Sequence, residues 1–357
     1  MFLSLEVSTI EHSQAVDDRY LERKLYDALF HTALNRIQAE KNKKLIRYTS
    51  YDKVVKMFQS MQLPMSHISY MNDHQEISYA ANIFINTLLH SKEATDLLKA
   101  YMRDFCKLPE KGSNEICQWL RTVKNRLRYD TNIISFSSVC QPPNNTQDTL
   151  TAYPQWNHGS SLMWQAYAPD MGAAIIFDLI SADCSPENPL SKMNVILSPV
   201  AYLSEVALEK TIIKTLKKVF VEFSNCEKPS YEYCNQAITS AIVFAMASIK
   251  HPAFSDEDEW RLIFLDNDTT RGLSASQFVN NNVRPFIPLV ANDDIGISVK
   301  KHFIKVILAP FKGAEASSIK LSRIMEECGV ENAKEKICIS EIPLRTQEKN
   351  SNIILKA

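Results

Sequence analysis

Apolar positions along this chain follow two periods, and they predict a mixture of helices and strands. Residues 14–42 carry leucine and isoleucine at helical spacing with charges elsewhere, which predicts an exterior amphipathic helix. Residues 45–49 are typical of a short strand, and Ser50 follows where it can cap a helix that carries Val54 and Phe58. The chain therefore enters its main domain as strand, turn and helix.

Helical spacing dominates the first third of the chain, and strand-like runs dominate the middle. A long helical region is predicted over 77–107, and Gly112 introduces another helix. A polar loop with three prolines is expected over 141–158. The remaining predicted elements are strands at 133–138, 173–178, 195–203, 259–266, 304–308 and 337–342, and helices at 205–223, 233–249 and 318–328.

Strands and helices do not alternate regularly, which favours an α+β fold over a doubly wound parallel sheet. We expect a mixed or antiparallel sheet core, a helix-rich N-terminal third and inserted helices. Residues 1–43 would form a helical extension, residues 44–345 a single domain, and residues 346–357 a loose tail.

Composition and charge narrow the classes of protein. The chain has 357 residues, of which 45% are apolar and 23% charged, and this is ordinary globular composition. Its net charge of −1 supplies no global field for nucleic acid or anionic lipid. The N-terminus lacks the pattern of a signal peptide, and no apolar run reaches membrane-spanning length. We therefore expect a cytoplasmic protein without membrane contact.

Cysteine and glycine spacing excludes several kinds of site. The eight cysteines form no C-x-x-C pair, which favours free packing thiols over disulfides or a zinc site, so no metal is expected. The seven glycines form neither G-x-G-x-x-G nor a Walker loop, so a common phosphate-binding loop is not expected. The motifs H-E-x-x-H, G-x-S-x-G and the EF-hand loop are also missing from the sequence.

The most informative segment is the acidic run at 256–259, which leads straight into an apolar strand. In an extended chain, residues i and i+2 face the same side, so Glu257 and Glu259 would line one cleft at a sheet edge. Paired carboxylates can divide the work of glycosyl transfer, since one stabilises a sugar cation while the other positions or deprotonates an acceptor. The alternative is an acidic turn exposed to solvent.

Arg47 lies in the early strand between Ile46 and Tyr48. A guanidinium on a strand that faces a cleft can bind phosphate or ribose oxygens with its fork of donors. The alternative is an edge-strand arginine in water.

Two further groups of residues are candidates for ligand contact. Trp164 and Tyr167 are three apart and could stack on a planar base or nicotinamide, although such pairs usually belong to a core. Asn72, Asp73 and Glu76 precede a predicted helix, where they could cap it and complement its dipole, or form a polar loop that closes over a ligand.

Seven stretches, taken in order, resemble the bacterial domain-of-unknown-function family 2971. They are LIRYTSYDKVVKMFQS (45–60), MNDHQE (71–76), IISFS (133–137), LMWQAYAPDMGAAIIFD (162–178), VAYL (200–203), DEDEWRLIF (256–264) and IKVILAP (304–310). The resemblance spans residues 45–342 and leaves the N-terminal helix outside. The sequence departs from the family pattern near Met61, where a glycine is expected, and within MNDHQE.

A looser likeness links the chain to the ADP-ribosyltransferase superfamily. It consists of a first strand with arginine and threonine, a helix, an aromatic-bearing middle and a late strand preceded by E-x-E. This likeness implies a split sheet with NAD as substrate. It implies that Arg47, with Tyr48 and Thr49 beside it, holds NAD, that Glu259 contacts the nicotinamide ribose, and that Glu257 faces the acceptor.

The same likeness assigns roles in the middle of the chain. Ser135 or Ser137 would match the middle-strand serine, and Tyr167, with Trp164 nearby, would stack on the nicotinamide. The implied activity is that of an NAD-dependent ADP-ribosyltransferase, or of an NAD glycohydrolase if water is the acceptor. The resemblance also implies a bacterial toxin or phage-defence effector.

Two other functions remain open at this point. One is a non-catalytic binding or regulatory protein on the same scaffold, with Glu257 and Glu259 merely solvated. The other is a metal-dependent nucleic-acid-processing enzyme that uses Asp73, Glu76 and the two glutamates. The N-terminal helix could form a homodimer or bind a partner protein, or it could pack on its own domain.

Overall fold

The computed structural model describes residues 36–37, 39–70, 74–106, 112–143, 152–183, 190, 195–224, 231–265, 285–290 and 296–342, with the backbone alone at some helix ends. The predicted helix over 14–42 lies mostly outside these ranges, and the predicted tail over 346–357 lies wholly outside them. None of the helices in the described part is long and apolar enough to cross a membrane.

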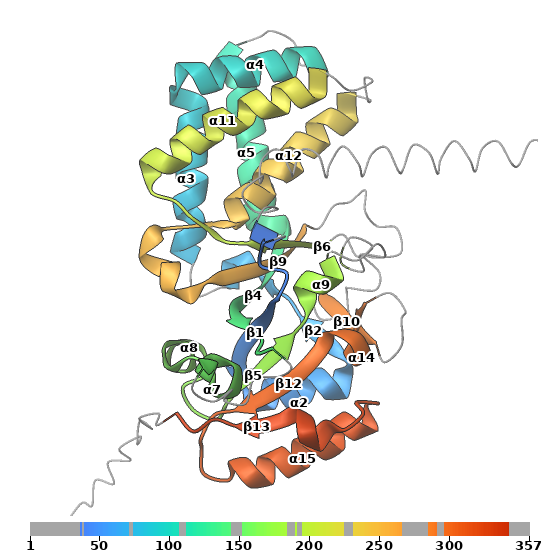
Figure 1. Cartoon of the computed structure of the whole chain (residues 1–357). Helices are drawn as coiled ribbons and strands as arrows, with labels where there is room; N and C mark the ends of the chain where they lie inside the picture. The colour runs from blue at the N-terminus through green and yellow to red at the C-terminus, as the bar shows by residue number, and fades with distance from the viewer. Residues whose placement is uncertain are drawn as a thin grey trace, which may run out of the picture.

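A mixed sheet lies below a bundle of helices (Figure 1). Its strands, in spatial order, are β13 (Ile337–Ile339), β12 (Phe303–Leu308), β5 (Gly172–Phe177), β1 (Lys43–Ser50), β4 (Thr131–Cys140), β9 (Glu259–Leu265) and β6 (Val195–Pro199), and β3 (Ser66–His67) also pairs with β4. Neighbours are antiparallel except for β12 and β13. The α+β class with a mixed sheet is therefore confirmed.

The predicted strand over 195–203 is wrong in one respect, because it divides after Pro199. β9 begins at Glu259, and the N–H of Val200 donates a 2.9 Å hydrogen bond to the carbonyl oxygen of that residue. Beyond Val200, the chain therefore has no residue of β9 to pair with. The chain pairs instead as β7 (Ala201–Tyr202) with β8 (Ile249–Lys250). A third, small sheet contains β2 (Gln62–Pro64), β10 (Phe286–Val290) and β11 (Ile297–Ser298).

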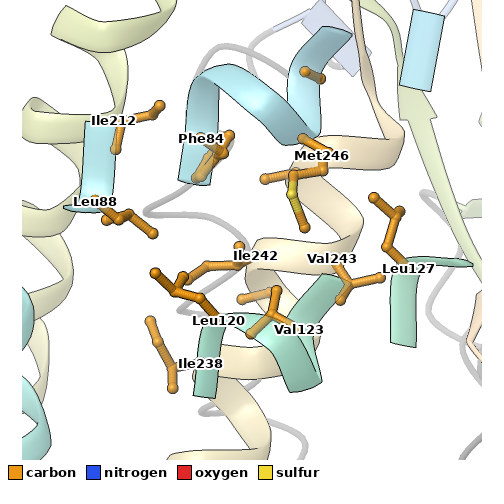
Figure 2. Close-up of a cluster of buried hydrophobic side chains, with 14 of the residues drawn as sticks. Phe84, Leu88, Leu120, Val123, Leu127, Ile212, Ile238, Ile242, Val243 and Met246 are labelled. Atoms are coloured by element: carbon orange, nitrogen blue, oxygen red, sulfur yellow. The ribbon is translucent and has the colours of Figure 1, made fainter. Parts of the chain in front are cut away.

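The helical bundle consists of α3 (His74–His90), α4 (Lys92–Cys106), α5 (Gly112–Asp130), α11 (Glu205–Ser224) and α12 (Tyr231–Ala247). Figure 2 shows its core, in which Phe84, Leu120, Ile212 and Ile242 come from four of these helices. The helical region predicted over 77–107 is helical as far as Cys106, but it is divided into two helices at Ser91. The hydroxyl oxygen of Ser91 accepts a 3.4 Å bond from the N–H of Ala94 and so begins a new helix.

Helices also cover both faces of the sheet around β1. On one face, α2 (Tyr51–Ser60) and α15 (Ala314–Glu327) bury Leu45 and Ile175. On the other, α7 (Pro154–His158) and α8 (Ser161–Tyr167) lie against Ile46 and Ile176. The short elements are α9 (Leu179–Asp183), α14 (Val299–His302) and the 3₁₀ turns η1 (Ile68–Tyr70), η2 (Pro252–Glu257) and η4 (Ala333–Lys336).

The ends of α2 qualify two sequence expectations. Ser50 stands at the N-cap position, but its side chain makes no capping bond, so the predicted cap is wrong in its chemistry. The helix ends at Met61, whose φ of 50° is left-handed, the conformation that glycine adopts most easily. A methionine therefore has a backbone conformation that suits glycine, at the position where the sequence comparison expects a glycine.

Candidate functional site

The central sheet opens between β1 and β4. β1 pairs with β5 as far as Ser50, but with β4 only as far as Ile46, which lies opposite Ser137. Further along β4, the short strand β3 takes the place beside Ile133. Residues 134–136 of β4 therefore have neither strand beside them at this edge. The opening gives access to side chains from both halves of the sheet.

A cavity of about 250 Å³ lies at this opening. The residues singled out by the sequence that line it are Arg47, Tyr48, Thr49, Ser135, Ser137, Tyr167, Glu257 and Glu259. They come from β1, β4, α8 and the turn that joins η2 to β9, four segments that are far apart in the sequence. Ligand pockets typically hold roughly 300–1,000 Å³, so this cavity encloses at most one end of a dinucleotide.

Arg47 spans the opening. Its Nη1 donates a 3.1 Å hydrogen bond to the carbonyl oxygen of Ser135 on β4. Within the described part of the chain, no carboxylate pairs with this guanidinium. Loss of solvation lowers the pKa of Arg47 to about 10, so the group is still a cation at neutral pH. A partly buried cation without a carboxylate partner among the described residues is a candidate binding site for an anion.

Glu259 is the first residue of β9, and it is 5% exposed. Its two oxygens accept bonds of 2.7 and 3.0 Å from Nε and Nη2 of Arg261, which is fully buried. The Nζ of Lys250, also fully buried, lies 3.2 Å from Oε2. Burial alone would raise the pKa of Glu259, but the ion pairs with Arg261 and Lys250 lower it to about 2. The carboxylate is therefore ionised at neutral pH.

Glu257 and Glu259 reach the same cavity, but not for the reason that an extended chain suggests. Asp258 between them has a left-handed backbone with φ 41°, so the segment is a turn and the argument from i and i+2 is wrong. Lys250 joins the two carboxylates instead, since its Nζ donates a 2.6 Å bond to Oε2 of Glu257 as well. The expectation that both glutamates are simply solvated is also wrong for Glu259.

Ser137 places a hydroxyl on the cavity wall. The side chain is 7% exposed, and its Oγ has no hydrogen-bond partner in the described part of the chain. An unpartnered buried hydroxyl is destabilising unless a ligand or water satisfies it. Together with Arg47, it indicates that the cavity is built for a polar occupant.

The two aromatic residues predicted to stack on a ligand have different surroundings. Trp164 is fully buried, packs edge-on against Tyr48 at 4.9 Å between ring centroids, and donates a 2.8 Å bond to the carbonyl of His158. It does not line the cavity, so its proposed contact with a ligand is corrected to a core role. Tyr167 lies three residues on, is 37% exposed and does line the cavity.

Asn72 and Asp73 lie outside the described residues, as does the side chain of Glu76. Their roles stay predictions. Among the described residues, no group of three His, Cys, Asp or Glu side chains could hold a metal ion. The five cysteines with described thiols are free, namely Cys117, Cys140, Cys234, Cys328 and Cys338.

Sequence reasoning missed Lys250 and Arg261. The ion pair of Arg261 could have been predicted from the sequence. A charged residue inside an otherwise apolar strand needs a buried partner, and Glu259, two positions earlier, faces the same side of the strand. The role of Lys250 could not have been predicted, since this residue lies in the short strand β8, beside the end of α12. With Arg47 and Lys53, four cations line or adjoin the cavity against two carboxylates, which favours an anionic ligand.

Comparison with protein families finds similarity over residues 163–262 to the family described as a protein of unknown function, DUF2971. The matched segment includes Tyr167, Glu257, Glu259 and Arg261, but not β1 with Arg47. No curated protein and no solved structure is significantly similar to this chain. The wider family resemblance over 45–342 stays a prediction, and none of these comparisons bears on the likeness to ADP-ribosyltransferases.

Proposed function

We propose that this chain consumes NAD, as an ADP-ribosyltransferase or, with water as acceptor, as an NAD glycohydrolase. What carries the proposal is the opening of the sheet between β1 and β4, where Arg47, Ser137 and the pair Glu257 and Glu259 share one cavity. The excess of cations suits a diphosphate, and the cavity volume of about 250 Å³ suits the nicotinamide-ribosyl end of the molecule. The role as a toxin or phage-defence effector is part of this proposal.

Arg47 would bind the diphosphate at the mouth of the opening. Its guanidinium has five donors, and one of them is engaged by Ser135, so most of the fork remains for phosphate oxygens. Loss of the nicotinamide leaves positive charge on the ribose, with the electron pair of the broken C–N bond on nicotinamide. Glu259 is ionised and buried, which is the arrangement that stabilises such a charge.

Both carboxylates keep acceptor capacity despite their cationic partners. Each oxygen of Glu259 has about two acceptor positions, and a ribose hydroxyl can use those left free by Arg261 and Lys250. Glu257 uses Oε2 for Lys250 and can hold the incoming nucleophile through Oε1. When water is the nucleophile, the products are ADP-ribose, nicotinamide and one proton, which leaves to solvent.

A second function is favoured by one specific observation. Both oxygens of Glu259 are already held by buried cations, which is also how a purely structural buried carboxylate is satisfied. On this reading the cavity binds an anionic nucleotide through Arg47 without chemistry at Glu259. The metal-dependent nucleic-acid-processing alternative also stays a prediction, because Asp73 and the Glu76 side chain lie outside the described residues.

The test is release of free nicotinamide from NAD by the full-length protein, with NAD binding followed by calorimetry. We expect Arg47→Gln to raise KM and Glu259→Gln to lower kcat by roughly a hundredfold or more, as when a buried group that stabilises charge is lost. Glu209→Gln, on the exposed surface of α11, is the matched control and should leave turnover unchanged.

Three results would count against this proposal. Equal turnover by the wild type and Glu259→Gln would remove the role given to that glutamate. NAD binding without nicotinamide release would favour the binding protein. A wild type that neither binds nor cleaves NAD would reject both functions.

A further inference from the structure

The turn between the two candidate catalytic glutamates has an unfavourable backbone that something must hold. Asp258 is left-handed, with φ 41° and ψ 52°, and is not a glycine. A left-handed backbone costs most residues roughly 1–2 kcal/mol, and aspartate adopts it where its short side chain is hydrogen-bonded, so the contacts of that side chain decide whether the turn persists. The turn ends η2 and begins β9, and it therefore sets the directions of Glu257 and Glu259.

The side chain of Asp258 binds residues on three other segments. Its carboxylate accepts hydrogen bonds from the hydroxyl of Ser138 and from Nη2 of Arg36, and a 3.2 Å bond from Nζ of Lys43. Its carbonyl accepts a 3.1 Å bond from the N–H of Ser138. These charge-assisted bonds are the compensation that the backbone requires.

Arg36 is the centre of this cluster. Its Nε donates to Oε1 of Glu40 at 2.8 Å, and its Nη1 donates to the carbonyl of Val200 at 3.2 Å. Its guanidinium also lies over the ring of Trp260, 5.6 Å from the centroid. Three donors of one fork are therefore committed to different segments, a geometry that a lysine could not reproduce.

The cluster holds the turn from the face of the sheet opposite the side chain of Glu259. Trp260 is buried in the core beneath α2 and α15, and Ile37, next to Arg36, is buried in the same core. Glu259 precedes Trp260 on β9 and faces the other side, because alternate residues of a strand point to opposite faces. The contacts of Arg36 therefore act on the cavity through the strand and not by touching a ligand.

We propose that Arg36 and Lys43 are positioning residues, which hold Asp258 in its left-handed turn and so keep Glu257 and Glu259 together on the cavity wall. The catalytic consequence rests on the proposed function, whereas the structural one does not. Arg36 and Lys43 lie outside the segment 163–262 that resembles the family.

Hydrogen exchange followed by mass spectrometry tests the structural step on the full-length protein. In Arg36→Gln and in Asp258→Asn, we expect the peptide over 256–259 to exchange about tenfold faster, while residues 262–265 of β9 keep their protection. Asparagine tolerates the left-handed backbone, so Asp258→Asn isolates the loss of charge. Arg103→Gln, which breaks an exposed ion pair on α4, is the matched control and should not alter this peptide.

Nicotinamide release from NAD tests the catalytic step. In both variants we expect kcat to fall about tenfold while KM for NAD changes less than about twofold, because Arg47 and the rest of the cavity are untouched. Unchanged exchange over 256–259 overturns the proposal. So does faster exchange with wild-type kcat, since the turn would then not position the catalytic pair. If the wild type releases no nicotinamide, the proposed function fails, and hydrogen exchange alone decides whether Arg36 holds the turn.

Discussion

Replacing Glu259 with glutamine should destabilise the protein in a way that depends on pH. The substitution keeps the shape of the side chain but removes the negative charge that two fully buried cations share. Arg261 would then lose its ion pair with Glu259, and Lys250 would lose one of the two carboxylates that it contacts. Removal of one partner from a buried ion pair leaves an uncompensated charge, and this typically costs roughly 3–5 kcal/mol.

The lowered pKa of Glu259 gives a second measure of the same loss. The pKa falls from an ordinary 4.5 to about 2 in the folded protein. One pKa unit corresponds to about 1.4 kcal/mol, so the folded state favours the carboxylate by about 3 kcal/mol. The two arguments agree, and we expect Glu259→Gln to lower the free energy of unfolding by about 3 kcal/mol at pH 7.

The sign of the pH dependence follows from the direction of that shift. Because folding lowers the pKa, the stabilisation is complete above pH 4.5 and is lost as the pH falls from 4.5 towards 2. The difference between wild type and Glu259→Gln should therefore shrink by about half or more at pH 3. Urea denaturation at the two pH values measures it, and the exposed Glu209→Gln should stay within about 0.5 kcal/mol of wild type throughout.

Two outcomes would refute this reasoning. A difference below about 1 kcal/mol at pH 7 would mean that the bonds to Arg261 and Lys250 contribute little. A full difference that persists at pH 3 would mean that packing of the side chain, and not its charge, holds this part of β9.

Three further substitutions separate groups kept for a ligand from groups kept for the fold. Arg47→Leu should abolish nucleotide binding but leave the free energy of unfolding unchanged or raise it by about 1 kcal/mol. The reason is that this cation has lost solvation and has no carboxylate partner among the described residues. A clear loss of stability in urea would contradict this expectation. Ser137→Ala should be neutral or slightly stabilising in the same assay and should weaken nucleotide binding measured by calorimetry, because the Oγ has no partner in the described part of the chain. Gly159→Ala should lower the free energy of unfolding by about 2 kcal/mol. The backbone φ at this position is 75°, and the new Cβ would lie 2.7 Å from Nε1 of the buried Trp164. If the variant is as stable as the wild type, α8 can shift to make room for the methyl group.

Most elements were predictable because their patterns are local. The strand around Arg47 and the helix that follows it are confirmed as β1 and α2. A run of a few residues is enough to distinguish the spacing of apolar residues in a strand from that in a helix. The predictions that proved wrong depend on partners elsewhere. The break at Ser91 and the division after Pro199 follow from a capping bond and from where β9 begins.

The candidate site was predictable residue by residue, but not as an arrangement. Arg47 and Glu259 stood out because a charge beside apolar neighbours in a strand requires an explanation. Trp164 and Tyr167 looked equivalent in sequence, and only packing separated the buried ring from the one on the cavity. Periodicity says which residues share a face, but it does not say what covers that face.

The sequence by itself determined the α+β class, the order of the main helices and strands, and the chemistry of the residues in β1, β4 and β9. The tertiary structure alone decided that β1 leaves β4 after Ile46, that the resulting cavity gathers four distant segments, and that Lys250 and Arg261 form ion pairs with Glu259. The reason is physical, because local spacing fixes backbone conformation over a few residues. Strand pairing depends instead on contacts between residues far apart in the chain, such as Ile46 and Ser137, and the compensation of buried charge depends on how the chain folds back to bring Lys250 against Glu259.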